Sequence, residues 1–372
     1  MKNPRKLIAR IIVVLLAIVP VVLLLVGVEY ATRVLFKPID PRSVFIIAPS
    51  SSPEDNPTVF DHKRFWKLRA GMNARSFVST TVTTNSSGVR WDKDFEKKDP
   101  LTIRIVTIGD SVTFGWGVPN EPTRGVMNYS ANLQRSLRER HGDWKWEVIP
   151  LACPGYTTAQ GRFWLEELFG VIQPDIIVPC FAWNDASDSM RTNNQVGMYS
   201  KSAQRIRWLA EHSQAITRFL DWRNGKGKKL YSDVERESKE WLRLPRTTLE
   251  DFIMDHEAMW QLAKRHSAET VVILPMITVL DEKHPFTNEC IKLYRTKLSE
   301  FCQNRQIPTL HIPELTEAHA PGNFDLFTPD KIHPNTEGHK LVAERLYPVI
   351  VPAIDRVTAA RRTENAKAHP AQ

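Results

Sequence analysis

Short apolar segments alternate with longer helical patterns over residues 101–355, and this alternation constrains the fold more than any other feature. The expected strands are Ile103–Ile108, Trp146–Leu151, Asp175–Cys180, Thr270–Leu274 and Thr309–Ile312, and the expected helices are Thr123–Arg140, Thr158–Phe169, Leu249–His266 and Asn288–Arg305. Strands and helices that alternate in this way place helices on the faces of a parallel sheet. The pattern therefore predicts an α/β domain with helices on both faces of the sheet.

A second feature is the apolar segment 7–28, in which residues 11–28 carry no charge. This stretch is close to the length that crosses a bilayer as a helix. Basic residues precede it and favour a cytoplasmic N-terminus, although Arg33, Lys37 and Arg42 follow it and weaken the asymmetry. We predict a retained single-pass anchor in the cell membrane, with the main domain extracytoplasmic. A cleaved signal peptide is the competing interpretation, but its apolar region is usually about 7–15 residues long.

Four parts follow from these patterns. Residues 1–37 form the cytoplasmic N-terminus and anchor, residues 38–100 a linker and small β-extension, residues 101–355 the main domain, and residues 356–372 a polar, flexible tail. Within the main domain the alternation stops over about 188–245. Long connections inside a compact domain are usually functional loops or disordered insertions. We interpret this insertion as a helical lid, and a solvated excursion without a role is the alternative.

Composition excludes some classes of protein. Fifty Lys and Arg against 42 Asp and Glu give a net charge of +8, but the basic residues are scattered, apart from the N-terminus, Lys226–Lys229 and Arg361–Arg362, and no nucleic-acid motif accompanies them. We therefore expect no nucleic-acid partner. Cys290 and Cys302 lie on one expected helix, roughly 18 Å apart along its axis, which is too far for a disulfide bond. A disulfide framework is not indicated, and the oligomeric state is not determined by the sequence.

The candidate nucleophile is Ser111, in the segment Gly109-Asp110-Ser111 that directly follows the first expected strand. Ligands of open α/β sheets bind beyond the carboxyl ends of strands, where this hydroxyl would lie. A serine after a strand also commonly caps the next helix, and this is the structural alternative for an isolated motif.

Asp330 and His333 form the second signal, because their spacing allows both side chains to share one face of a helical turn. The carboxylate can then bind one imidazole nitrogen and leave the other as a base, which a serine hydroxyl needs before it can act as a nucleophile. Structural hydrogen bonding and metal binding are the alternatives. His339 lies nearby, but no cluster of Cys or carboxylates completes a metal site.

Two further strand ends supply candidate donors for an oxyanion. Gly155 follows the second expected strand and offers a backbone N–H, and Asn184 follows the third and offers a side-chain amide. Such donors typically contribute about 10²–10³ in rate each. Either segment taken alone is typical of an ordinary turn.

Together, Ser111, Gly155, Asn184 and His333 occur in the order and contexts of the four sequence blocks of the SGNH (GDSL-like) hydrolases, and the sequence resembles that superfamily over roughly residues 101–350. The resemblance implies a flavodoxin-like three-layer α/β/α sandwich with five parallel strands and no metal or organic cofactor. It implies a catalytic triad of Ser111, Asp330 and His333. It also implies oxyanion donors from the backbone N–H groups of Ser111 and Gly155 and from the Asn184 side chain. The chain looks like bacterial membrane-anchored members.

One position departs from the family pattern, because Ala182 stands where the third block usually has glycine. The extra methyl group restricts the backbone without removing a reacting group, and it makes the position of Asn184 less certain. Trp116 and Trp183 lie near the expected site in the sequence and are candidates to line it, although most tryptophans simply pack in cores.

The functional hypothesis is a membrane-anchored, extracytoplasmic serine esterase that hydrolyses carboxylic esters. O-acyl groups of envelope glycans or lipids are its expected substrates, by location alone. An O-acyltransferase using the same triad is the first alternative. A non-catalytic envelope scaffold or binding protein is the alternative of another class, and it predicts the loss of at least one of the site residues.

Overall fold

The computed structural model describes residues 4–45, 56–77, 80–121, 125–189, 191–224, 244–276, 284–316 and 323–368. The chain divides into two compact units. Unit 1 consists of Met1–Asn56, Phe60–Trp66 and Ser200–Lys239. Unit 2 consists of Pro57–Val59, Lys67–Tyr199 and Glu240–Gln372.

Unit 2 is built on a parallel sheet with β5 (Thr102–Gly109) at its centre. This strand pairs with β8 (Lys145–Ala152) on one side and with β9 (Ile176–Cys180) on the other. The next strand is β12 (Glu269–Thr270), so the order of the four-stranded sheet is β12-β9-β5-β8. All residues of β5 and β9 are buried. Burial on both faces explains why β9 is continuously apolar and why β5 is an otherwise apolar strand that polar residues such as Arg104 and Thr107 interrupt.

The fifth strand is β14 (Thr309–Leu310). It pairs in parallel with β13 (Val272–Ile273), which follows β12 after the single residue Val271. The N–H of Val271 still bonds the carbonyl of Ile177 in β9, so β13 continues the path of β12. The predicted α/β fold with a parallel sheet is confirmed, and each of the predicted strands has a counterpart.

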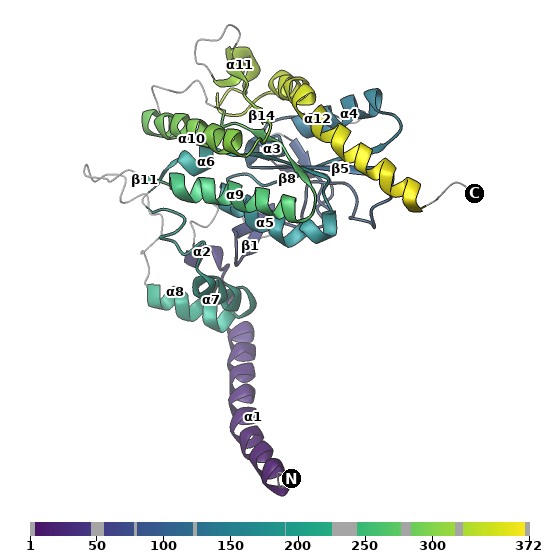
Figure 1. The fold of residues 1–372 in the computed structure, drawn as a ribbon. Coiled ribbons are helices and arrows are strands. Elements are labelled where there is room, and N and C mark those ends of the chain that lie inside the picture. The colour runs from purple at the N-terminus through teal and green to yellow at the C-terminus, as the bar shows by residue number, and fades with distance from the viewer. Residues whose placement is uncertain are drawn as a thin grey trace. The chain divides into compact units, whose positions relative to one another are not determined.

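Helices cover both faces of this sheet (Figure 1). On one face α4 (Tyr129–Arg140) packs against α12 (Thr336–Ala368), and on the other α5 (Thr158–Ile172) packs against α9 (Leu249–Arg265), which also contacts α10 (Pro285–Asn304). Side chains of α4 and α12 form one core with the sheet. They include the fully buried residues Leu133, Leu137, Val342, Leu346 and Ile350. Short elements complete the unit, namely β3 (Arg75–Phe77), β4 (Thr80–Val82), α3 (Ser111–Phe114), β6 (Asn120–Glu121), β7 (Gly125–Val126), α6 (Trp183–Ala186), β10 (Asp188–Ser189), β11 (Leu244–Pro245), α11 (Pro313–Thr316) and a 3₁₀ helix (Asn323–Leu326).

The C-terminal helix differs from expectation. We predicted a flexible tail over residues 356–372, but α12 continues to Ala368. Val357 and Thr358 are buried, and the Arg361 guanidinium donates to Asp175 at 2.9 Å. The segment looks polar in the sequence because only one side of the helix faces the domain.

Helix α4 begins later than expected, at Tyr129 rather than Thr123. The Asn128 side chain caps it by accepting a hydrogen bond from the N–H of Ala131. Helix α10 is unbroken between Cys290 and Cys302, as predicted.

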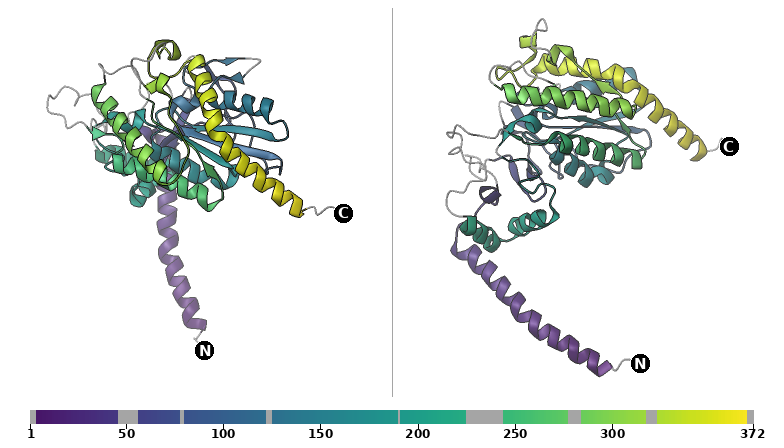
Figure 2. Two further views of the ribbon diagram at one scale, coloured as in Figure 1. Left: turned by 45° about the horizontal axis from the view of Figure 1, so that its top comes forward. Right: turned by 60° about the vertical axis from the view of Figure 1, so that its left-hand side comes forward.

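Unit 1 contains α1 (Pro4–Leu35), α2 (Arg42–Phe45), α7 (Lys201–His212) and α8 (Gln214–Asn224). Strands β1 (Thr58–Asp61) and β2 (Phe65–Leu68) pair where the chain passes between the units. Helix α1 includes one stretch, Val13–Leu35, that is long and apolar enough to cross a membrane. The helices of the predicted insertion thus group with the N-terminal helix (Figure 2). Residues 225–243 of that insertion and residues 46–55 of the predicted linker lie outside the described residues.

Candidate active site

Ser111 is the first residue of α3, directly beyond the carboxyl end of the central strand β5. The carboxylate of Asp110 caps this helix by accepting a hydrogen bond from the N–H of Val112 at 2.9 Å. Gly109 is required for this turn, because a Cβ at that position would lie 2.0 Å from the Thr113 hydroxyl and 2.7 Å from the carbonyl of Cys180. The two residues before Ser111 thus form the turn that exposes its hydroxyl.

His333 lies in the loop before α12 and meets Ser111 from far along the chain. Its Nε2 is 2.8 Å from Ser111 Oγ, and its Nδ1 is 2.7 Å from Asp330 Oδ2. The other oxygen of Asp330 accepts from the Thr328 hydroxyl at 2.7 Å and from the backbone N–H groups of Ile332 and His333. Ser111, His333 and Asp330 therefore form one continuous chain of hydrogen bonds.

The charges along this chain are set by burial and hydrogen bonding. Partial burial opposes ionisation of Asp330, but hydrogen bonds from Thr328, His333 and Ile332 outweigh it and lower its pKa to about 2. Burial lowers the pKa of His333, and the neighbouring Asp330 works against that shift. At neutral pH the carboxylate is ionised and the imidazole is neutral. Its Nδ1–H then donates to Asp330, which leaves Nε2 as the acceptor for the serine proton.

Asn184 lies in α6, beyond the carboxyl end of β9, and its side-chain amide donates to Asp110 at 3.1 Å. A side-chain amide carries two N–H groups. The bond to Asp110 uses one of them and orients the side chain, and the second N–H can donate to another acceptor. Burial raises the pKa of Asp110 to about 7, against the hydrogen bonds from Val112 and Asn184. Ala182 has φ −177°, which is extended backbone that any residue adopts. Alanine at this position therefore imposes no strain on the segment that carries Asn184.

Gly155 lies in the loop after β8 with φ +79°, a left-handed conformation that favours glycine. Its carbonyl accepts from the Arg246 guanidinium at 2.8 Å, and the same guanidinium donates to Gln160 at 3.0 Å. The loop is thus held by a residue from beyond the long insertion. This role of Arg246 was not predicted from the sequence, because no motif surrounds the residue.

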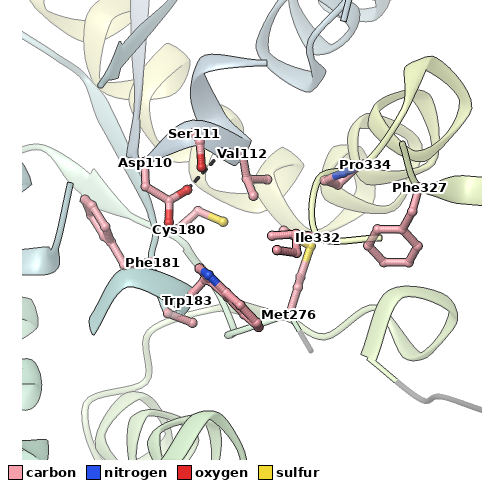
Figure 3. A pocket seen from close by; sticks show the side chains of 11 residues that line it. Asp110, Ser111, Val112, Cys180, Phe181, Trp183, Met276, Phe327, Ile332 and Pro334 are labelled. Carbon is pink, nitrogen blue, oxygen red and sulfur yellow. Dashed lines mark hydrogen bonds between the residues drawn. The ribbon is translucent and has the colours of Figure 1, made fainter. Parts of the chain in front are cut away.

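The two candidate tryptophans take different positions. The Trp116 ring stacks on the His333 imidazole, with centroids 5.6 Å apart. Trp183 lines a cavity of about 30 Å³ beside Ser111. Figure 3 shows Trp183, Met276 and Ile332 around this cavity, with Asp110 and Ser111 on one side of it. Trp116 therefore supports the imidazole, whereas Trp183 forms part of the cavity wall.

Among the described residues, neither His339 nor His256 belongs to a cluster that could hold a metal ion. His339 is fully buried, and its Nδ1 accepts from the N–H of Tyr129. His256 is buried in α9, with its Nδ1 bonded to the carbonyl of Phe252. Within the part of the chain that the structure describes, no three His, Cys, Asp or Glu residues gather in a way that could hold a metal ion.

Sequence reasoning missed two supporting residues besides Arg246. Asp110 was noted only as part of a motif, although it links the serine turn to the Asn184 amide. Thr328 bonds Asp330 from two residues away, and a hydroxyl at that spacing was a signal that could have been used.

A parallel α/β sandwich with a serine at the carboxyl end of its central strand, hydrogen-bonded to a histidine, is the arrangement of a serine hydrolase. The chain belongs to the GDSL-like Lipase/Acylhydrolase family, whose model matches residues 107–341, more than half of the 372 residues. The resemblance inferred from the sequence is therefore confirmed. The protein is an ester-hydrolysing enzyme.

Solved structures that resemble this chain share about one residue in seven with it. LAE5, an alpha/beta hydrolase from the metagenome of Lake Arreo, matches with a TM-score of 0.43 and 14% identity over 67% of this chain and 96% of its own. Axe2, an acetylxylan esterase from Geobacillus stearothermophilus, matches with a TM-score of 0.42 and 14% identity over 68% and 96%. A lipase/acylhydrolase from Enterococcus faecalis matches with a TM-score of 0.40 and 17% identity over 67% and 95%. A comparison with curated proteins gave no match.

Proposed function

We propose that the protein is an esterase in which Ser111 attacks the carbonyl carbon of a carboxylic ester. His333 takes the serine proton through Nε2 and then returns it to the leaving alcohol. Asp330 holds the imidazole in the required tautomer and stabilises the imidazolium that forms. The observation that supports this proposal is the unbroken chain of hydrogen bonds from Ser111 Oγ through His333 to Asp330, with 2.8 Å and 2.7 Å between the paired atoms.

The negative charge that develops on the carbonyl oxygen needs donors close to Ser111. The backbone N–H groups of Ser111 and Gly155 and the second N–H of the Asn184 amide are the proposed donors. Donors that are positioned before the reaction stabilise the oxyanion without a cost for reorganisation. Asp110 serves this step indirectly, because it orients the Asn184 amide.

After the alcohol leaves, the acyl group stays bonded to Ser111 Oγ as an ester. Water then attacks this acyl-enzyme with His333 again accepting a proton, and the acid and the free serine are regenerated. If a sugar hydroxyl took the place of water, the product would be a transferred acyl group. Product analysis in the presence of a candidate glycan acceptor distinguishes these two outcomes.

The acyl group is proposed to be short. The cavity beside Ser111 has a volume of about 30 Å³ and is lined largely by apolar side chains, among them Trp183, Met276 and Phe327. For comparison, an engineered apolar cavity of about 150 Å³ binds benzene, so a cavity of this size matches a group as small as an acetyl methyl. Hydrolysis of p-nitrophenyl acetate should therefore be faster than that of p-nitrophenyl octanoate.

We further propose that α1 anchors the enzyme in the cell membrane with its catalytic part outside the cytoplasm. The apolar stretch Val13–Leu35 supports the anchor, and the basic residues before it support the orientation. Esters of envelope glycans or lipids are then the substrates within reach. A reporter that is active only outside the cytoplasm, fused to the C-terminus, should be active in cells, and an inactive reporter would contradict the orientation.

Ser111→Ala is the decisive variant for the catalytic proposal. It should abolish hydrolysis of p-nitrophenyl acetate and labelling by a fluorophosphonate probe, because both require the serine oxygen. Ser299→Ala is the matched control, since Ser299 lies on the surface helix α10, outside the site. A Ser111→Ala protein that keeps its activity would refute the proposal, and an unlabelled wild-type protein would favour a non-catalytic scaffold.

A further inference from the structure

Unit 1 carries an unusual concentration of exposed aromatic side chains. Of the described residues, the aromatic side chains that are exposed are Tyr30, Phe36, Trp208, Phe219 and Trp222, and all of them belong to unit 1. The large apolar side chains exposed in the described part of unit 2 are Leu101, Val171, Met254 and Leu293, which come from four different segments. Scattered exposed leucines need no explanation, but a gathered set of aromatic residues does.

Three of these five aromatic residues, Trp208, Phe219 and Trp222, lie on the helix pair α7–α8, whereas Tyr30 lies on α1 and Phe36 directly follows it. In α8, Phe219 and Trp222 are three residues apart and therefore share one face, with ring centroids 6.0 Å apart. Their exposed fractions are 55% and 77%. In α7, Ile206 and Leu209 are also three apart and are 45% and 43% exposed. Both helices thus present apolar side chains to the outside although each also has a buried side, which includes Ala210 and Leu220.

This helix pair is fixed to the C-terminal part of α1. The Glu29 carboxylate caps the start of α8 by accepting from the Ser213 hydroxyl at 2.7 Å and from the backbone N–H groups of Gln214 at 3.0 Å and Ala215 at 3.1 Å. Arg33, one turn further along α1, donates to the carbonyl of His212 at 3.2 Å. The cap compensates the charge of Glu29 at the N-terminal end of a helix, where a carboxylate is favourable.

A second set of bonds holds the chain just beyond α1. The Gln214 side chain pairs with the backbone of Ile39, donating to its carbonyl at 3.1 Å and accepting from its N–H at 2.8 Å. The guanidinium of Arg218 bonds the carbonyl of Lys37. The pair α7–α8 is therefore attached on both sides of the point where α1 ends.

The position of Glu29 defines the level of this attachment in a membrane. The uncharged residues 11–28 form a helix roughly 27 Å long, which is close to the hydrocarbon thickness of about 30 Å. Glu29 then emerges at the boundary between hydrocarbon and headgroups. Helix α8, which it caps, runs crosswise to α1 (Figures 1 and 2). A helix attached crosswise at that level extends along the membrane surface.

The charge of the pair fits the same location. Over residues 201–224 the sequence has five Lys and Arg against two Asp and Glu, a net charge of +3. Lys201, Arg205 and Arg223 are exposed, and Arg218 and Arg223 flank Phe219 and Trp222 along α8. Aromatic and leucine side chains combined with basic residues are typical of helices that lie in the interface, where cations meet lipid phosphates.

We propose that the α7–α8 pair lies in the headgroup region of the membrane that α1 crosses, with Trp208, Phe219 and Trp222 inserted among the lipids. The inference rests on the proposed membrane-spanning role of α1. It adds a second, peripheral contact that restricts how unit 1 tilts and rotates about its anchor.

The test places an environment-sensitive nitrobenzoxadiazole dye at single cysteines of the full chain. Phe219→Cys is the probe position, Leu293→Cys on α10 is the control at a comparably exposed apolar position, and Leu23→Cys reports on α1. Every variant carries Cys290→Ser, because Cys290 is the cysteine that is not buried. The proteins are reconstituted in vesicles of phosphatidylcholine and phosphatidylglycerol, with and without lipids that bear a nitroxide quencher in the acyl chain near the headgroup.

We expect a blue-shifted emission at position 219 that the shallow nitroxide quenches, and a water-like, unquenched emission at position 293. A water-like emission at 219 overturns the inference. A blue shift that no lipid nitroxide quenches also overturns it, since the face is then covered by protein, such as a second copy of the chain. Equal quenching at 219 and 293 would mean that the dye itself partitions into lipid, and it overturns the inference as well.

Position 23 separates this inference from the proposal on which it rests. Quenching at 23 by a nitroxide deep in the bilayer, without quenching at 219, refutes the interfacial contact and leaves the anchor intact. The absence of quenching at 23 refutes the anchor itself.

Discussion

Asp330 and His333 illustrate how a few hydrogen bonds set the chemistry of single side chains. Asp330 is half-exposed. Burial of its other half raises its pKa, but hydrogen bonds from Thr328 and from two backbone N–H groups outweigh this effect and lower the pKa to about 2. His333 is mostly buried, and this burial lowers its pKa despite the carboxylate beside it. A base with a lowered pKa is deprotonated over a wider pH range, so the enzyme should remain active in mildly acidic solution.

The pH profile tests this reading of His333. In the proposed mechanism activity requires the neutral imidazole, so kcat/KM should rise with pH through the pKa of His333, and the midpoint should lie below that of an ordinary histidine, about 6.5. Asp330→Asn removes the interaction that raises this pKa. Its acidic limb should therefore move to still lower pH, while kcat falls by roughly 10²–10⁴-fold. An acidic limb that moves to higher pH would contradict the assigned contact.

Ala182 gives a second prediction at this scale. Its backbone is extended, at φ −177°, so the glycine that usually occupies this position in the family offers no conformational advantage here. Ala182→Gly should leave kcat and KM unchanged and lower the stability by about 1 kcal/mol, because the unfolded chain gains freedom. Denaturant unfolding and esterase kinetics on the same preparation measure both quantities. A rise in kcat would show that the methyl group does restrict Asn184.

At the scale of elements, the long C-terminal helix α12 is held to unit 2 over most of its length. Its core side chains pack on the sheet together with α4. Near its end Arg361 reaches Asp175, which also accepts from Lys98 and from the N–H of Arg104 at the start of β5. The last turns of the helix therefore hold the amino-terminal ends of β5 and β9, opposite the end of β5 that carries Ser111.

Truncation of α12 measures this contribution. A protein ending at residue 355 loses the buried side chain of Val357, which contributes about 1.5–3 kcal/mol, together with the Arg361–Asp175 bond. Its melting temperature should fall by roughly 5 °C. A protein ending at residue 368 keeps the whole helix and is the control. Equal melting temperatures for the two truncated proteins would show that residues 356–368 add nothing to stability.

At the scale of the whole molecule, the residues of the proposed active site and the apolar helix α1 belong to different units. Ser111, Asp330, His333, Gly155 and Asn184 all belong to unit 2. The apolar helix α1 and the helices that it contacts belong to unit 1. Two compact units that each contain their own contacts can change independently.

Removal of the anchor tests this separation. A protein that begins at Pro38 lacks α1 and the Glu29 cap of α8, but it keeps every residue of the proposed active site. It should hydrolyse p-nitrophenyl acetate with an unchanged kcat/KM, while hydrogen exchange in α8 becomes faster because the helix has lost its cap. Loss of activity in a folded protein of this kind would show that the anchor supports the site.

The sequence by itself determined the α/β architecture, the apolar N-terminal segment and the residues proposed to react. These features are local: a buried strand needs a run of apolar residues, and Gly109, Asp110 and Ser111 form a turn within a few positions of one another. Tertiary structure alone decided which distant groups meet. The bond from Arg246 to Gly155, the bond from Asn184 to Asp110 and the capping of α8 by Glu29 each join segments far apart in the chain. No pattern in one segment encodes such a pairing, because it depends on the packing of the segments between them.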